Sequence, residues 1–481
     1  MSDTNELSTI KVSSEPLHGG RISRMLYGGF IELLDDLVPG MWAELLNDRA
    51  FEGVGRAVKW CYYTGVPNFC DRDWDVNNTW TYDTEKPFVG SRSAKLTASK
   101  SQKATLTQQG LAVKKGAAYH FYGYFRSDSS DIQARIVLKT LLPDDTWMEL
   151  GSKSLPNPGT DWKKLETDIT ATGTSDKVVF ELEVTGSGSL WADKLSLMPS
   201  DNIKGWRVDV VEAIKAQRPG VIRWGGSLVD PGGYKWKAGI GDRDRRVPFP
   251  DPYWGRKHSN DVGIDEYLQF CELVEAEPLI CISFGDGVES GRDLIEYCNG
   301  SVDTKWGGKR AENGHPEPYN VKYWQIGNEL VGEEYSAGCV EFCKMIREIQ
   351  PDAIILSSDP TPELFRKVGQ YIDYACPHHY VPDLEQDEAS IAHAVEIINQ
   401  FGRAGEVKLG ITEWNISAGS WGLTRGKQYT LDSAMFTGRY LNLLNRHSDV
   451  VGIACRSNMN NSYCSGMIQT NPSGLFGTPS Y

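Results

Sequence analysis

The stretch "VKYWQIGNEL", residues 321–330, places a carboxylate directly at the end of a buried strand. Its apolar run is typical of an interior strand of a parallel sheet, and a Gly-Asn pair breaks the run just before Glu329. The stretch "VKLGITE", residues 407–413, repeats this arrangement and ends on Glu413. Catalytic groups of (β/α)8 barrels lie at the carboxyl ends of the strands. The two stretches therefore predict a pair of reactive carboxylates at the mouth of a barrel.

Residues from about 203 onward alternate short apolar runs with helical patterns, which is typical of a parallel sheet. The expected strands are 220–224, 278–284, 321–326, 353–358, 371–376, 407–412 and 449–455. The upstream run "MLYGGFIE", residues 25–32, supplies one more strand, and "MWAELLNDRAF", residues 41–51, is expected to be the helix that follows it. The predicted fold class is α/β, a (β/α)8 TIM barrel, in which Glu329 and Glu413 end the fourth and seventh strands.

An all-β domain is expected inside the barrel sequence. Over residues 56–202, alternating segments are separated by turns rich in Gly, Ser, Asp and Pro, and helical periodicity is nearly absent. This pattern predicts an inserted jelly-roll sandwich, similar to a carbohydrate-binding module. Residues 1–55 would then hold the N-terminal segment with the first barrel strand and helix, and residues 203–481 the remainder of the barrel.

The charge balance argues against nucleic acid and membrane partners. The chain has 64 acidic and 50 basic residues, a formal charge of −14, and no prominent run of Lys or Arg. A neutral plant polysaccharide or oligosaccharide suits this surface better, and 15 Trp and 21 Tyr supply rings that can stack on sugars. In the predicted sandwich, Trp147, Trp162 and Trp191 could form a sugar-binding platform or fill the core.

The cysteine pattern and the N-terminus suggest neither a metal site nor a membrane anchor. The segment "MSDTNELSTI" has no basic stretch followed by an apolar run, and no stretch is long enough to span a bilayer. The chain as written is expected in the cytoplasm, or outside the cell if a signal peptide was removed. Ten Cys show no C-x-x-C spacing, so no zinc site and no other cofactor is expected. Most Cys read as small buried apolar residues, and Cys61 and Cys70 would be a candidate disulfide in a secreted protein.

Two carboxylates at a barrel mouth suit glycoside hydrolysis, although a single Glu at a strand end is often a helix cap or a surface ion pair. One carboxyl group protonates the leaving oxygen and the other faces the anomeric carbon. In a retaining enzyme the nucleophile must stay ionised, which requires cations and hydrogen-bond donors beside it. The acid must hold its proton, which requires a drier setting or a neighbouring negative charge. Retention also requires the carboxyl groups to lie about 5 to 5.5 Å apart.

The motifs "WQIGNEL" and "ITEWN" resemble the acid/base and nucleophile motifs of glycoside hydrolase family 51, the retaining α-L-arabinofuranosidases. The resemblance covers most of the barrel, through "LYGGFIE", "GMWAELLNDRAFE", "VIRWGGSLVDPGGYKWKAGIGDRDRRVP", "GIDEYLQFCELVEAEPLICISF" and "PHHY". The related family 39 shares the two Glu residues and the clan, and remains a neighbouring alternative. The resemblance implies that Glu329 is the general acid/base and Glu413 the nucleophile.

The resemblance also implies roles for residues around this pair. Arg223 would be the cation beside Glu413, and Tyr380 its phenolic hydrogen-bond donor. Asn328 would bind the 2-hydroxyl of the sugar, a contact that strengthens in the transition state. His378 would polarise or orient a carboxylate; the alternative is a neutral, packed imidazole.

Further implied contacts concern the sugar ring, and one of them departs from the family pattern. Glu32 would bind the far hydroxyls of the furanose, or else cap a helix. Trp414 and Trp421 would wall the sugar pocket, or else belong to the core. The segment "WGGS", from Trp224 to Ser227, stands where the family usually reads Pro-Gly-Gly-Asn. A short hydroxyl thus replaces an amide that normally reaches the sugar, and a ring enters beside it.

Two more departures lie near the C-terminus. Cys455 stands where family members often carry a Gln, whose contact a thiol cannot replace. Family members normally continue into a C-terminal sandwich, whereas this sequence ends at Tyr481. The flank that such a sandwich would cover could instead support self-association into a homo-oligomer.

The sequence therefore predicts a retaining exo-α-L-arabinofuranosidase that releases arabinose from side chains of plant arabinoxylan and arabinan. Two alternatives stay open. An endo-β-glucanase or xylanase could use the same pair of Glu residues in an open cleft, which the change at Trp224 and Ser227 would allow. A non-catalytic carbohydrate-binding protein would use the sandwich alone.

Overall fold

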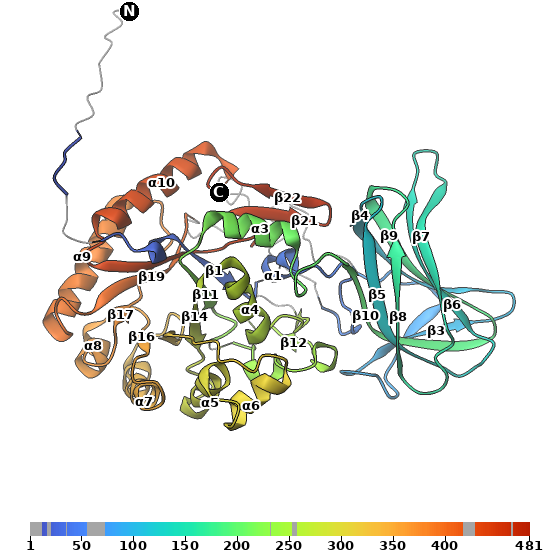
Figure 1. The fold of residues 1–481 in the computed structure, drawn as a ribbon, viewed down its shortest axis with the longest axis horizontal. Coiled ribbons are helices and arrows are strands. Elements are labelled where there is room, and N and C mark those ends of the chain that lie inside the picture. Colours follow the sequence, from blue (N-terminus) through green and yellow to red (C-terminus); the bar gives the residue numbers. More distant parts are fainter. Residues whose placement is uncertain are drawn as a thin grey trace, which may run out of the picture.

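The computed structural model describes residues 12–16, 21–34, 36–54, 73–230, 232–252, 257–416, 429–462 and 465–481. Figure 1 shows two units side by side, a barrel surrounded by helices and a unit built from antiparallel strands. No helix in these ranges combines the length and the apolar character needed to cross a membrane.

The barrel is a closed sheet of eight parallel strands, as the sequence predicts. The strands are β1 (Gly28–Glu32), β11 (Val221–Gly225), β14 (Glu277–Ile282), β15 (Tyr323–Ile326), β16 (Ile354–Leu356), β17 (Tyr374–Ala375), β19 (Lys408–Trp414) and β20 (Val451–Arg456). Each strand pairs with the next in this order, and β20 pairs with β1. The short β18 (His378–His379) follows β17, and both pair directly with β19. The sheet therefore has no open edge.

Helices cover the outside of the barrel. They are α3 (Val208–Gln217), α4 (Ile264–Val274), α5 (Val288–Asn299), α6 (Lys305–Glu312), α7 (Glu333–Ile349), α8 (Pro362–Val368), α9 (Leu384–Phe401) and α10 (Leu431–Arg446). After β20 the chain forms a hairpin of β21 (Ile468–Asn471) and β22 (Gly474–Gly477), which lies beside α3 (Figure 1). The strands separate a small inner core from a large core under the helices.

The helix expected over residues 41–51 is absent. The short helix α1 (Leu37–Met41) ends where that pattern begins, and the following residues form loops and turns, with positive φ at Asp48 and Phe51. Leu45 donates its backbone N–H to the carbonyl of Leu197, 2.9 Å away, and Phe51 is buried in the core of the second unit. The apolar residues of this stretch are spaced as on a helix, but they are buried against the strands instead, so tertiary packing overrides the local propensity.

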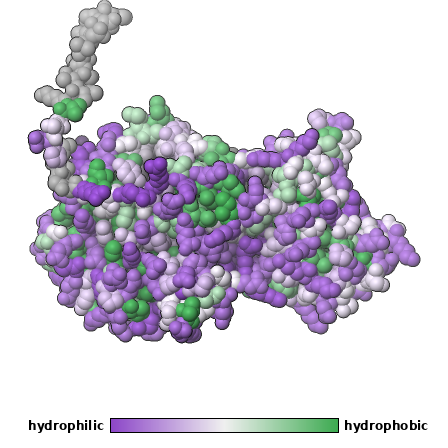
Figure 2. Space-filling model, viewed as in Figure 1, coloured by the Kyte–Doolittle hydropathy of each residue, from purple (hydrophilic) through white to green (hydrophobic). Residues whose placement is uncertain are grey.

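The second unit is an antiparallel sandwich, as predicted. One sheet contains β2 (Trp80–Asp83), β3 (Ser93–Ala98), β10 (Gly188–Pro199), β5 (Ala118–Ser127) and β8 (Lys163–Thr170). The other contains β4 (Ala104–Val113), β9 (Ser175–Thr185), β6 (Gln133–Leu141) and β7 (Trp147–Leu155). Figure 2 shows that the visible surface of both units is mainly hydrophilic.

The three tryptophans singled out in the sandwich lie outside its apolar core. Trp147 is 53% exposed and Trp162 is half-buried. Trp191 is buried, but its ring carries the charged groups of Lys95 and Arg126 at 4.8 and 4.0 Å from its centroid. Cation–π contacts thus already occupy the Trp191 ring.

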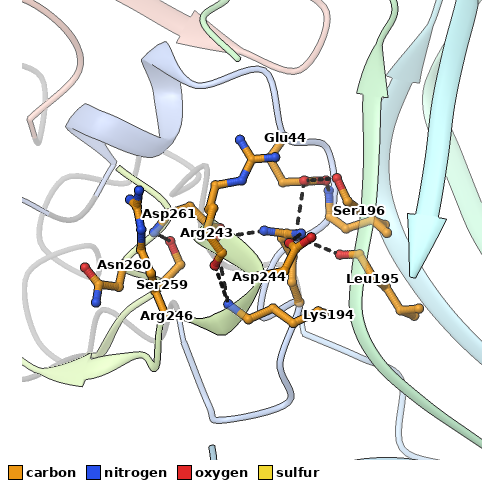
Figure 3. A network of polar contacts seen from close by, with 12 residues as sticks. Glu44, Lys194, Leu195, Ser196, Arg243, Asp244, Arg246, Ser259, Asn260 and Asp261 are labelled. Atoms are coloured by element: carbon orange, nitrogen blue, oxygen red, sulfur yellow. Dashed lines mark hydrogen bonds and ion pairs between the residues drawn. The ribbon is translucent and has the colours of Figure 1, made fainter. Parts of the chain in front are cut away.

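A buried charge network joins the sandwich to the barrel (Figure 3). The Arg49 guanidinium, with 2% of its side chain exposed, lies 2.8 Å from both Asp244 and Asp261 of the barrel loop after β11. Its Nε donates to the carbonyl of Leu195 in β10, and an Nη donates to the hydroxyl of Tyr122 in β5. The sandwich is therefore fixed to the loop that borders the barrel mouth.

All seven described cysteines, Cys271, Cys281, Cys298, Cys339, Cys343, Cys376 and Cys455, are buried and free, which confirms their assignment as small core residues. The Cys61 and Cys70 pair lies outside the described residues.

Candidate active site

The predicted residues come together at the carboxyl ends of the strands. Glu32 ends β1, Arg223 lies in β11, and Glu329 follows β15 by three residues. His378 lies in β18 and Glu413 in β19, where the two are register partners. Strand geometry alone thus gathers groups that are up to 381 positions apart, as 413 minus 32.

A β-bulge turns Glu413 into the barrel. Ile411 pairs with Ala454 and Trp414 with Arg456. Between these two pairings β19 advances by three residues and β20 by two, so β19 contains one extra residue. The extra residue lets Thr412 and Glu413 both point inward, although successive side chains of a regular strand alternate. Glu413 is 5% exposed, Arg223 lies 2.6 Å from its Oε1, and Tyr380 donates a short hydrogen bond to its Oε2. These contacts hold both carboxylate oxygens of Glu413 in place.

Arg223 is fully buried beneath the site and has three acceptors. Besides Glu413, it donates from Nε to Gln325 at 2.6 Å and from Nη2 to the amide oxygen of Asn328 at 2.7 Å. Burial alone would lower the pKa of Arg223, but the charge of Glu413 raises it above its usual value. Arg223 therefore carries a fixed positive charge that also orients Asn328.

Glu329 is more accessible than Glu413, with half of its side chain exposed. Its backbone φ is 53°, a left-handed conformation that costs a non-glycine residue about 1–2 kcal/mol. The Oε1 atom lies 2.8 Å from Nδ1 of His378, whose Nε2 lies 3.1 Å from the hydroxyl of Thr412. One carboxylate oxygen of Glu329, one of Glu413 and a nitrogen of His378 all lie within 4.8 Å of one another.

The electrostatics of Glu329 differ from the sequence-based expectation of a raised pKa. The hydrogen bond from His378 holds the pKa of Glu329 below its usual value, against the opposing effect of partial burial. The ionised form is therefore favoured in this conformation of the site.

Glu32 and Tyr380 complete the wall around Glu413. Glu32 is 7% exposed and accepts a hydrogen bond from the backbone N–H of Ser227 at 3.0 Å. Burial, and then the charge of Glu413, raise the pKa of Glu32 well above its usual range. The Tyr380 hydroxyl also contacts the hydroxyl of Ser457 at 3.0 Å.

The two described tryptophans of the predicted site do not face the mouth. Trp224 follows the inward Arg223 and is 1% exposed, and its ring packs against Tyr267 in the core under the helices. Trp414 follows the inward Glu413 and packs its ring against Tyr440 of α10, 4.6 Å between centroids. The expectation that these rings line the sugar pocket is wrong, because strand alternation points them outward. Trp421 lies outside the described residues.

Sequence reasoning missed several polar residues of the site. Gln325 and Thr412 link Arg223 to His378, and a Gln within the apolar strand "YWQI" was the available signal. Ser457 directly follows β20. Asp359 follows β16, and burial raises its pKa.

In the described parts of the chain, the group of residues with metal-ligand atoms close together is Glu329, His378 and Glu413. A carboxylate pair with one imidazole can bind zinc. However, the Arg223 guanidinium lies 2.6 Å from Glu413 and already neutralises it, which disfavours a second cation. The arrangement suits acid–base and nucleophilic chemistry between two carboxylates instead.

Three family models match the chain. Residues 213–394 match the α-L-arabinofuranosidase 1 domain, residues 412–481 the α-L-arabinofuranosidase C-terminal domain, and residues 45–193 a carbohydrate binding domain. The first two include Arg223, Glu329, His378 and Glu413, whereas β1 with Glu32 lies outside both matches. The third covers most of the sandwich.

Curated relatives carry the same description. A probable α-L-arabinofuranosidase C of Aspergillus fumigatus is 30% identical over 308 residues, which is 53% of this chain and 60% of that protein. α-L-Arabinofuranosidase 2 of Arabidopsis thaliana is 25% identical over 98% of this chain and 73% of its own length. The chain thus spans about 60% of the length of the fungal relatives it matches.

Solved structures similar to this chain include α-L-arabinofuranosidases of family 51. The thermostable family 51 α-L-arabinofuranosidase of Thermotoga petrophila is 31% identical, with a TM-score of 0.54 over 58% of this chain and 63% of that chain. An arabinose-bound family 51 α-L-arabinofuranosidase aligns over 95% of this chain and 79% of its own, with a TM-score of 0.78. At 17% identity this second likeness concerns the fold alone.

Proposed function

Because this chain belongs to glycoside hydrolase family 51, the α-L-arabinofuranosidase family, we propose that it is a retaining exo-α-L-arabinofuranosidase. The observation that carries this proposal is the pair Glu329 and Glu413, with carboxylate oxygens within 4.8 Å of each other. Retaining glycosidases need carboxyl groups about 5 to 5.5 Å apart, whereas inverting enzymes leave room for a water and need about 6.5 to 9.5 Å.

The surroundings of the two carboxylates support one assignment of their roles. Glu413 is buried and paired with Arg223 and Tyr380, which suits a nucleophile that must stay ionised. Glu329 is half-exposed, so it can reach a leaving group that extends toward solvent. In the first step an oxygen of Glu413 attacks the anomeric carbon, the bond to the leaving oxygen breaks, and the proton of Glu329 passes to that oxygen.

In the second step Glu329, now a carboxylate, takes a proton from water. The water oxygen attacks the anomeric carbon, Glu413 leaves as a carboxylate, and arabinose is released with its configuration retained. Since His378 lowers the pKa of Glu329, the protonated form that the first step requires is favoured by acidic conditions. Activity is therefore expected to fall as the pH rises.

Glu32, Ser227 and Asn328 are proposed to bind the sugar. Glu32 lies beside Glu413 and its raised pKa allows a protonated carboxyl that can donate to a hydroxyl as well as accept. The oxygen of Asn328 is taken by Arg223, which leaves its amide NH2 to donate to the 2-hydroxyl. The proposed substrates are arabinosyl side chains of plant arabinoxylan and arabinan.

We further propose that residues 56–202 form a separate sandwich domain between residues 1–55 and 203–481, and that it contributes to binding of the polymer. The match of residues 45–193 to a carbohydrate binding domain supports this. The core of the sandwich also takes in Leu45, Leu46 and Phe51, which precede the proposed boundary.

Hydrolysis of p-nitrophenyl α-L-arabinofuranoside tests the proposal, with the anomer first formed identified by proton NMR. Wild type should release p-nitrophenol and form the α anomer first, and Glu413→Gln should lose this activity. On arabinoxylan, free arabinose should appear without an early loss of viscosity. Rapid loss of viscosity on xylan or β-glucan, with no turnover of the arabinoside, would show an endo-acting enzyme instead.

A further inference from the structure

Asp230 is a buried carboxylate near the site that neither the resemblance nor the proposed chemistry uses. It lies on the loop after β11, seven positions after Arg223, as 230 minus 223, and it is 0% exposed. Burial raises its pKa. A fully buried carboxyl group is costly unless hydrogen bonds compensate it, so its partners indicate why it is there.

The partners of Asp230 come from two neighbouring loops of the barrel mouth. Its Oδ1 accepts from the Ser283 hydroxyl at 3.2 Å and from the Gly285 backbone N–H at 3.0 Å, both just after β14. Its Oδ2 accepts from the backbone N–H of Asn328 at 3.3 Å, one residue before Glu329. One side chain thus connects the loops that follow the second, third and fourth strands.

The backbone that Asp230 holds has an unusual shape. Gly327 has φ of 70° and Glu329 has φ of 53°. The turn that follows β15 therefore contains two residues with left-handed backbone, and Glu329 is one of them. A Cβ on Gly327 would lie 3.1 Å from Oδ2 of Asp230 and 2.7 Å from a methyl of Leu330, so this turn also needs a glycine for space. A conformation of this kind persists only where the surroundings fix it.

Two other backbone N–H groups of this turn donate to partners other than Asp230. Gly327 donates its N–H to the carbonyl of Ile282 at 3.0 Å, and Leu330 donates its N–H to the hydroxyl of Ser358 at 3.2 Å. These bonds hold the residues on either side of Asn328 and Glu329. The backbone N–H of Asn328 is held by Asp230, and the side-chain oxygen of Asn328 is held by Arg223.

We propose that Asp230 is a positioning residue that sets the backbone of Glu329 for proton transfer. This rests on the proposed function, because it takes Glu329 as the acid/base. A hydrogen bond to a charged acceptor is stronger than one to a neutral group. The Asp230 carboxylate therefore fixes the backbone N–H of Asn328 better than a neutral side chain would. Loss of this bond lets Glu329 move away from the leaving oxygen while Glu413 keeps its own partners.

Substrates that differ only in the leaving group separate this role from general support of the fold. A p-nitrophenoxide leaves with little help from an acid, whereas methoxide needs a proton. Asp230→Ala should therefore lower kcat/KM for methyl α-L-arabinofuranoside at least tenfold more than for the p-nitrophenyl substrate. Asp230→Asn keeps the shape of the side chain and one acceptor oxygen. It should also lower kcat/KM more for the methyl than for the p-nitrophenyl substrate, but by a smaller factor. Azide, a nucleophile that needs no base, should accelerate turnover of the p-nitrophenyl substrate by the Asp230 variants but not by wild type.

Asp265→Asn is the matched control. Asp265 is also a buried carboxylate, 5% exposed, and accepts from the hydroxyls of Tyr297 and Tyr319, but it lies in α4. This variant should keep the wild-type ratio between the two substrates and show no response to azide. Equal losses on both substrates in Asp230→Asn, without azide stimulation, would overturn the inference while leaving the proposed function intact. Wild type that turns over neither furanoside would instead overturn the proposed function, and the role of Asp230 with it.

Discussion

Replacement of Arg49 by Met removes the centre of the charge network between sandwich and barrel. Arg49 is buried and contacts Asp244 and Asp261 at 2.8 Å and Glu44 at 3.3 Å. The network also holds Lys194, 3.9 Å from Asp261, so the carboxylates keep only part of their compensation in the variant. Methionine fills similar space but provides no charge and no donor.

The expected cost follows from the burial of this network. Removing one partner of a buried ion pair costs about 3–5 kcal/mol, because the remaining charges stay buried with only part of their compensation. An unfolding entropy of about 2.1 cal/mol/K per residue gives roughly 1 kcal/mol/K for 481 residues if barrel and sandwich unfold together. The Tm of Arg49→Met should then fall by about 3–5 °C.

Differential scanning calorimetry of wild type, Arg49→Met and a surface control measures this effect. Arg135 is a suitable control because it also pairs with two carboxylates, Glu183 and Glu149, but its side chain is 43% exposed. Exposed ion pairs are worth at most about 1 kcal/mol, so Arg135→Met should lower Tm by about 1 °C or less. If both variants shifted Tm equally, the network would not hold the two units together and the reasoning would be refuted.

Three further outcomes follow from the site. His378→Ala should move the alkaline limb of kcat/KM to higher pH, because loss of the His378 hydrogen bond raises the pKa of Glu329, whereas His378→Asn keeps a donor and should move it less. Tyr380→Phe should lower kcat/KM roughly 10- to 150-fold, the equivalent of about 1.5–3 kcal/mol for a hydrogen bond to a charged group, while Tm changes little. Trp224→Ala should cost about 3–5 kcal/mol of stability in urea unfolding and leave KM unchanged, since its ring belongs to the core; a rise in KM alone would place it in the pocket.

The barrel could be predicted from the sequence because its strands carry an unambiguous local signal. Strands buried on both faces are short apolar runs, and the run that ends at Glu329 is a clear case. Residues 41–51 carry no comparable signal, because their apolar spacing suits a helix as well as burial against another unit. Contact with β10, which is distant in the sequence, decides their conformation.

The candidate site could be predicted in its charged centre but not in its walls. Glu413, Arg223 and Tyr380 come together because each lies in, or directly after, a different strand of the barrel. The direction of the Trp414 ring depends on strand alternation and on the bulge in β19. No residue type in the sequence indicates that bulge. Trp414 therefore belongs to the core although the motif around it suggested a pocket wall.

The stereochemistry of azide products formed by the Glu413→Ala and Glu329→Ala variants tests the central claim most directly. Both variants are incubated with p-nitrophenyl α-L-arabinofuranoside and azide, and the products are identified by NMR. With Glu413 as nucleophile, Glu413→Ala gives the inverted β-azide by direct attack, and Glu329→Ala gives the retained α-azide from the covalent intermediate. The opposite assignment of products would exchange the two roles, and β-azide from both variants would contradict a covalent intermediate on Glu413.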